Sequence, residues 1–101
     1  MELPMTTVPL KACPFDKAKV YKSPNKIILE SYGSTVVKAD RIISTNMFDI
    51  ACLECGRDVT NRHISSFLNE YFPAVQLEDV IKAERYGDSI RAILFSLEKV
   101  N

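Results

Sequence analysis

The residues of this chain whose types and spacing suggest chemistry are its three cysteines and single histidine. Cys52 and Cys55 belong to a Cys-x-x-Cys-Gly turn, in which Gly56 permits the positive φ that a metal-binding turn commonly needs. Cys13 stands in the stretch LKACPFDK, where a second such turn would begin, but Asp16 takes the place of its partner cysteine. Structural zinc is bound tetrahedrally, usually by thiolate or imidazole. The pattern therefore predicts an incomplete zinc site made of Cys13, Cys52 and Cys55.

Two residues are candidates for the missing ligand. His63 follows Cys55 near an expected helix start, from which its ring can turn back toward the cysteines. Asp16 occupies the knuckle position itself, although carboxylates are uncommon in structural zinc sites. We favour the set with His63 over the set with Asp16. The third alternative is that the thiols are buried as small hydrophobic groups without metal, so the expected cofactor is either none or one structural zinc ion.

The two cysteine-containing stretches also resemble a known family. Leu-Lys-x-Cys-Pro-Phe over residues 10–15, followed by Cys-x-x-Cys-Gly over residues 52–56, is similar to the restriction-alleviation (Lar-like) zinc-ribbon proteins of phages and prophages. Members of that family usually have Cys-Gly where this chain has Asp16-Lys17, so its first knuckle is degenerate. The resemblance implies a small accessory protein of a mobile genetic element. Such a protein binds and modulates a host protein, for example a restriction enzyme or another nucleic-acid enzyme.

Catalysis has little support in the sequence. His63 has no nucleophile beside it in the chain, and without metal it is expected at the surface of a helix start. The cysteine pair lacks the βαβ pattern of a thioredoxin-like redox site, and the three glycines are too scattered for a phosphate-binding loop. We therefore expect a protein that is not an enzyme.

The charge distribution leaves a second function open. The formal net charge is zero, but the first half of the chain is basic and the second half acidic. A lysine-rich stretch with one tyrosine among its lysines is typical of a solvated face, and it also suits direct contact with nucleic acid. Because the whole chain is neutral, we rank this nucleic-acid interface below protein binding. Its residues would be Lys17, Lys19, Tyr21, Lys22 and Lys26.

The expected compartment is the cytoplasm, that of the host cell if the protein is phage-encoded. No apolar run is long enough to span a membrane, and the first ten residues do not resemble a signal peptide. An odd number of cysteines with Cys-x-x-Cys spacing suits a reducing compartment. Membrane partners are therefore not expected.

The elements that must position these residues predict an α+β fold in one domain, residues 1–101. Residues 10–60 form a degenerate ribbon-like part with a small antiparallel sheet, and residues 61–101 form a helix and a hairpin. Strands are expected over 18–22, 26–32, 35–41, 42–45 and 48–52, with residues 48, 50 and 52 on one face. The central amphipathic helix spans residues 61–72, because an apolar stripe ends there at a proline. That stripe consists of Ile64, Phe67, Leu68, Tyr71 and Phe72.

The sequence pattern of the C-terminal part predicts a β-hairpin in which residues 78–86 pair with residues 89–99. Its turn would be the stretch from Tyr86 to Ser89, which contains Gly87. The alternative is an amphipathic helix over the first of these segments, with Leu77, Val80 and Ile81 on one side. The helix over residues 61–72 and the C-terminal hairpin add a hydrophobic core beyond what a minimal zinc ribbon has. Because this core would keep the domain folded without zinc, we slightly favour the metal-free protein. Exposed sheet edges also suggest self-association.

Overall fold

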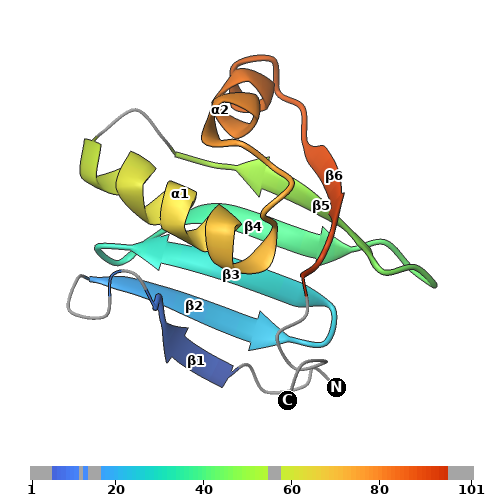
Figure 1. Ribbon diagram of the computed structural model, residues 1–101, viewed down its shortest axis with the longest axis horizontal. Coiled ribbons are helices and arrows are strands. Elements are labelled where there is room, and N and C mark those ends of the chain that lie inside the picture. Colours follow the sequence, from blue (N-terminus) through green and yellow to red (C-terminus); the bar gives the residue numbers. More distant parts are fainter. Residues whose placement is uncertain (1–5, 12, 14–16, 55–57, 96–101) are drawn as a thin grey trace.

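The fold is an antiparallel sheet with two helices on one face, and a computed structural model describes residues 6–11, 13, 17–54 and 58–95 of it (Figure 1). All six strands neighbour one another in the order of the sequence. The elements are β1 (Thr6–Pro9), β2 (Ala18–Ser23), β3 (Lys26–Ser31), β4 (Ser34–Arg41), β5 (Met47–Cys52), α1 (Asp58–Tyr71), α2 (Leu77–Arg85) and β6 (Ile90–Ile93). The predicted α+β class is therefore confirmed.

The core lies between the sheet and the helices. In β3 and β5 buried residues alternate with half-buried ones, and Phe48, Ile50 and Cys52 are buried on one face as predicted. The ring of Phe72, just after α1, meets Phe48 edge-on at 5.7 Å and Phe67 at 6.1 Å between centroids. Figure 1 shows both helices on the same side of the sheet. The opposite face is covered by no helix among the residues that the structure describes.

A β-bulge explains why the sequence pattern of β4 does not separate into two faces. Leu29 lies opposite Val37, but the next residue of β3, Glu30, lies opposite Thr35. Val36 is therefore an extra residue on β4, and both Val36 and Val37 are buried. A single inserted residue shifts the alternation by one position, and this shift removes the simple two-residue period.

Helix α1 confirms the predicted central helix, although it begins at Asp58, three residues before the predicted start, and ends one residue earlier, at Tyr71. Its buried side carries the predicted apolar stripe and, in addition, Thr60 and His63. The stripe packs on β3 and β4, whereas α2 packs on β5. Neither α1 nor α2 is long and apolar enough to cross a membrane.

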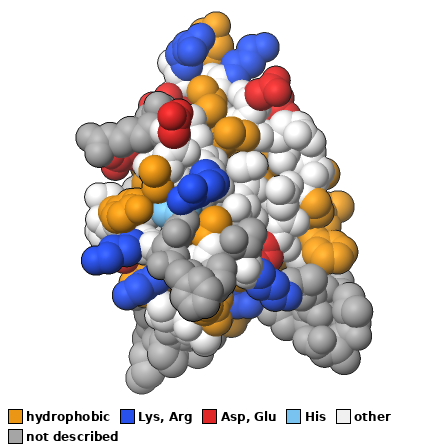
Figure 2. All heavy atoms as spheres, turned by 60° about the vertical axis from the view of Figure 1, so that its left-hand side comes forward, with side chains coloured by type: hydrophobic (Ala, Val, Ile, Leu, Met, Phe, Trp, Pro, Cys, Tyr) orange, Lys and Arg blue, Asp and Glu red, His pale blue; other side chains and the backbone are white. Residues whose placement is uncertain are grey.

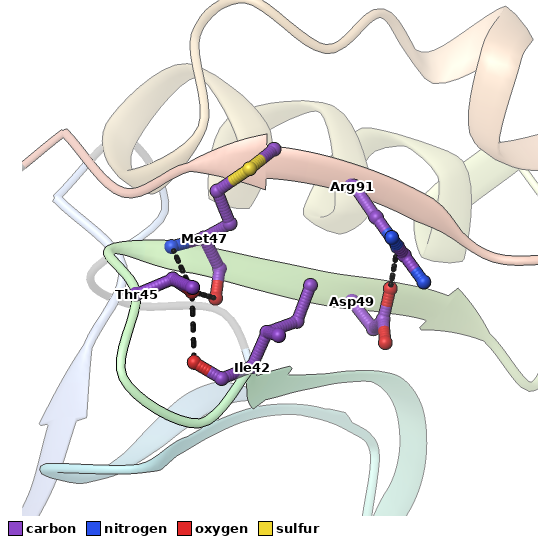
Figure 3. Close-up of polar contacts among 5 residues, drawn as sticks. All are labelled: Ile42, Thr45, Met47, Asp49 and Arg91. Atoms are coloured by element: carbon purple, nitrogen blue, oxygen red, sulfur yellow. Dashed lines mark hydrogen bonds and ion pairs between the residues drawn. The ribbon is translucent and has the colours of Figure 1, made fainter.

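The predicted C-terminal hairpin is wrong. Residues 77–85 form α2, and β6 pairs with β5 instead, where Arg91 Nε donates to Asp49 Oδ1 at 3.2 Å (Figure 3). The helix forms because Leu77, Val80 and Ile81 share one side, with acids in its first turn and bases in its last. Its end is a Schellman motif: Gly87 has φ +69°, its N–H donates to the Glu84 carbonyl, and Asp88 N–H donates to the Ala83 carbonyl.

The strand predicted over residues 42–45 is also wrong, because this segment turns the chain from β4 into β5. Ser44 has φ +65°, which no strand residue adopts. The Thr45 hydroxyl donates to the Ile42 carbonyl at 2.8 Å and accepts from Met47 N–H at 3.0 Å (Figure 3). A side chain that bonds nearby backbone groups in this way favours a turn over a strand.

Candidate functional site

A hollow of about 430 Å³ lies where the β3–β4 turn meets the N-terminal end of α1. This volume is within the range of about 300–1,000 Å³ that is typical of ligand pockets. Figure 2 shows this side of the molecule, where hydrophobic, acidic and basic side chains lie close together. We call it the Tyr32 hollow, and its lining residues are Ser31, Tyr32, Ser34, Val36, Glu54, Asp58, Val59 and Thr60.

A serine–histidine pair lies at the inner side of the hollow, between the hollow and the core. Ser31 Oγ lies 2.8 Å from His63 Nδ1, and the His63 ring is fully buried, whereas Ser31 remains 4% exposed at the hollow. A buried imidazole is costly unless its nitrogens are hydrogen-bonded. The expectation that a metal-free His63 lies at the surface is wrong, because the ring is on the inner side of α1 and finds its partner on β3.

Tyr32 holds an exposed ring at the edge of the hollow. It forms the two-residue β3–β4 turn with Gly33, and φ is +51° at Tyr32 and +83° at Gly33. Such turns favour Asn-Gly, and a bulky residue with this φ is strained. The ring nevertheless stays 58% exposed and stacks on His63, with 5.8 Å between ring centroids and 27° between planes. The sequence therefore keeps a large aromatic side chain here at a cost to the turn.

Two further hydrophobic side chains are exposed near Tyr32. Val59 lines the hollow and is 37% exposed, and Leu53 is 55% exposed. Leu53 does not line the hollow itself, but its backbone lies beside it, because its N–H donates to the carbonyl of the lining residue Val36 at 2.8 Å. We call Tyr32, Leu53 and Val59 the apolar rim. Exposed hydrophobic side chains grouped around a hollow are typical of a binding surface.

The predicted zinc ligands are only partly within the described residues. Cys13 and Cys52 are buried thiols: Cys13 Sγ lies 3.6 Å from Ser66 Oγ, and Cys52 Sγ donates to the Glu54 carbonyl at 3.5 Å. Cys55 and Asp16 lie outside the described residues. Among the described residues, no three His, Cys, Asp or Glu side chains are grouped as metal ligands would be. A zinc site made of Cys13, Cys52, Cys55 and His63 stays a prediction.

The residues of the predicted nucleic-acid interface are divided between the two faces of the sheet. Lys19, Tyr21 and Lys26 share the face without helices, as the register of β2 and β3 shows. Lys22 lies on the helix side, with its ammonium 5.5 Å from the centre of the Tyr71 ring, and Lys17 precedes β2.

Acidic groups also interrupt the basic residues on the open face. Lys26 pairs with Asp40 at 3.7 Å, and the Tyr21 hydroxyl donates to Glu30 at 3.3 Å. The described residues therefore form no continuous basic stripe, which is the usual electrostatic mark of a nucleic-acid interface.

No family model, no curated protein and no solved structure matches this chain. The resemblance to restriction-alleviation proteins therefore stays a prediction, and arguments about function depend on the site itself.

Sequence reasoning did not place Ser31, Tyr32, Val59 or Thr60 in a binding hollow. It considered Tyr32 only as an alternative ring for stacking on nucleic-acid bases, and Thr60 only as a helix cap. One signal was present: Tyr32 and Gly33 stand between two expected strands, where a two-residue turn favours Asn or Gly rather than tyrosine. A second signal was His63, directly beside the apolar stripe that begins at Ile64. Its partner Ser31 is 32 residues away in the chain, and no local pattern connects the two.

Proposed function

We propose that this protein is a non-enzymatic binding module that docks on a partner protein through the apolar rim and the Tyr32 hollow. The observation that carries the proposal is the exposed ring of Tyr32, which is kept in a strained turn and surrounded by further exposed apolar side chains. Backbone strain at a surface position is often retained for function. The resemblance of the cysteine-containing stretches adds the context of a mobile element and of a host nucleic-acid enzyme as partner.

The apolar rim has the composition of an interface anchor. Full burial of a side chain such as Val or Leu contributes roughly 1.5–3 kcal/mol, and aromatic side chains dominate many interfaces. Tyr32, Leu53 and Val59 are partly exposed already, so a partner that covers them gains a fraction of this energy for each. Polar groups border the same hollow, as they do around the apolar centre of many interfaces.

The serine–histidine pair supports binding rather than hydrolysis. A serine hydroxyl on an imidazole nitrogen is the arrangement of an activated nucleophile. Here, however, the hydroxyl satisfies a fully buried ring, and Ser31 itself is almost completely covered. We expect a fluorophosphonate probe to leave Ser31 unmodified at pH 8. Stoichiometric labelling of Ser31 would contradict the non-enzymatic proposal.

Affinity purification from a bacterial host followed by mass spectrometry tests the proposal. The full chain is compared with a rim variant, Tyr32→Asn with Val59→Ser, in which Asn suits the positive φ of the turn. Tyr86→Asn is the matched control, because Tyr86 is exposed but lies at the end of α2. We expect the wild type and the control to retain the same protein in stoichiometric amount, and the rim variant to lose it. Equal recovery by the rim variant, or no stoichiometric partner at all, would refute docking at this site.

Direct binding of nucleic acid is the weaker alternative, supported by the position of Lys19 and Tyr21 on one open face. Its test is a mobility shift with single- and double-stranded DNA and RNA at low ionic strength. Electrostatic binding to phosphate falls steeply with salt. We expect no salt-dependent shift, and a clear one that Lys19→Ala weakens would favour the alternative.

A further inference from the structure

We infer that the Tyr32 hollow accepts a cationic side chain, an arginine, presented by the partner protein. The inference rests on the proposed function and names the chemistry of the group that enters the site. It is carried by three features of the hollow: its charge, its aromatic wall and its hydroxyl groups.

Negative charge in the hollow has no partner among the described residues. Glu54 and Asp58 both line it, whereas the ion pairs between described residues join Lys26 with Asp40 and Arg91 with Asp49. None of the eight described lining residues is basic, and Arg57, which stands between Glu54 and Asp58 in the chain, lies outside the described residues. Lys17 is near the turn, where its carbonyl accepts the Tyr32 N–H at 2.8 Å, and Arg62 is on α1, but neither lines the hollow. A cation that entered would therefore meet two carboxylates that form no ion pair with another described residue, although the positive N-terminal end of α1 offsets part of the charge of Asp58.

The Tyr32 ring supplies a face for that cation. A guanidinium or ammonium group is attracted to an aromatic ring when it lies within about 6 Å of the ring centre. Such contacts already occur among the described residues: the Lys22 ammonium lies 5.5 Å from the Tyr71 ring centre, and the Arg41 guanidinium lies 5.2 Å from the Phe48 ring centre. Because Tyr32 stacks on a buried histidine that is itself hydrogen-bonded, its ring is held in place before the ligand arrives.

The remaining polar groups favour arginine over lysine. Ser34 and Thr60, whose side chains carry hydroxyls, line the hollow together with the two acidic residues, so the lining offers further possible acceptors. A guanidinium presents five N–H donors in a plane and stacks on aromatic rings, whereas an ammonium is a compact and strongly hydrated charge. The apolar rim suits the aliphatic stem of the same side chain. A nucleic-acid phosphate would instead be repelled by Glu54 and Asp58, so a protein is the source to which the inference commits.

The probe is the blocked peptide acetyl-Gly-Arg-Gly-amide, titrated into the ¹⁵N-labelled full chain and followed by amide chemical shifts. The matched control peptide carries citrulline, which has nearly the same shape without the charge. We expect saturable shifts at Gly33, Val59 and Thr60 with the arginine peptide, with a dissociation constant in the millimolar range. The citrulline peptide should bind at least about tenfold more weakly. Equal binding of the two peptides, or shifts confined to another surface, would overturn the inference.

Three variants test whether the two carboxylates and the aromatic ring of the hollow contribute to binding of the arginine peptide. Asp58→Asn, Glu54→Gln and Tyr32→Asn should each weaken the arginine peptide by about fivefold. Glu78→Gln removes a carboxylate from the exposed side of α2 and should change nothing. The amide spectra themselves show whether each variant is folded.

If the rim variant loses the partner but the arginine peptide binds nowhere near Tyr32, docking holds and the arginine inference fails. If the peptide binds as expected but no partner depends on the rim, the proposed function fails instead.

Discussion

His63 shows how a buried polar residue depends on a long-range hydrogen bond. Its Nδ1 meets Ser31 Oγ at 2.8 Å at a site where no solvent reaches the ring. A buried polar group that loses its partner costs about 1–3 kcal/mol. We therefore expect Ser31→Ala to lower the free energy of unfolding by that amount, measured by urea denaturation. Ser34→Ala is the control, since Ser34 is exposed, and equal effects of the two variants would contradict the role of Ser31.

Glu70 is a second residue whose environment has a measurable consequence. Its Oε2 is buried and has no hydrogen-bond partner among the residues that the structure describes. Burial raises the pKa of this carboxyl, and the Lys11 backbone N–H and the charges of Lys11 and Lys22 oppose the rise only in part. Between the ordinary and the raised pKa the folded protein binds more protons than the unfolded chain. The free energy of unfolding therefore falls as pH rises through this window.

Because burial disfavours the ionised carboxylate of Glu70 in the folded protein, we expect the neutral variant Glu70→Gln to have a higher melting temperature at pH 7. The difference from the wild type should shrink as pH falls below about 4, where the carboxyl becomes protonated in both states. Thermal melts of the two proteins across this range measure it. A constant difference at all pH values would show that Glu70 does not titrate in this way.

The zinc question is also decided at single residues. His63 Nδ1 is engaged with Ser31, and the thiols of Cys13 and Cys52 are buried with polar neighbours of their own. We expect protein purified without added metal to contain well below one zinc per chain, measured by elemental analysis, and to remain so after zinc reconstitution. A value near one would establish a metal site instead, and loss of zinc in Cys55→Ser would then assign Cys55 as a ligand.

At the scale of elements, prediction succeeded where one strong pattern dominates. The apolar stripe of α1 repeats over two turns and ends at Pro73, so helix is the only element that fits it. In α2 only Val80 is fully buried, and its nine residues suit a short helix or a strand about equally. Tertiary structure adds to the local preference for a helix, because β6 pairs with β5 and the segment before β6 packs on β5.

The end of α2 provides a direct test of its capping. Gly87 has φ +69°, and a Cβ added there would meet no atom within 4 Å, so only backbone strain opposes a side chain. We expect Gly87→Ala to lower the free energy of unfolding by about 1–2 kcal/mol, because alanine rarely adopts this conformation. Gly87→Asn should cost less, since asparagine tolerates positive φ. Equal unfolding curves for the alanine variant and the wild type would contradict the Schellman cap.

For the whole molecule, sequence reasoning predicted the fold class and most strands but missed the hollow. Alternation within β2, β3 and β5 is local and can be seen in the sequence. The Tyr32 hollow combines a turn, the residues after β5 and the first turn of α1, segments that only the folded sheet brings together. Its residues come from three places in the chain, and each has an ordinary local explanation. The proposed docking site therefore depends on a juxtaposition that no single motif describes.

Docking at the apolar rim is the central claim, and site-specific photocrosslinking in the bacterial host tests it most directly. A benzophenone amino acid replaces Val59 in the rim or, as a control, Glu78 on the exposed side of α2. Because the crosslinker reacts only with groups within a few ångströms, its position reports which surface the partner covers. We predict one covalent adduct from position 59 and none from position 78. The same adduct from both positions, or no adduct from position 59, would contradict docking at the Tyr32 hollow.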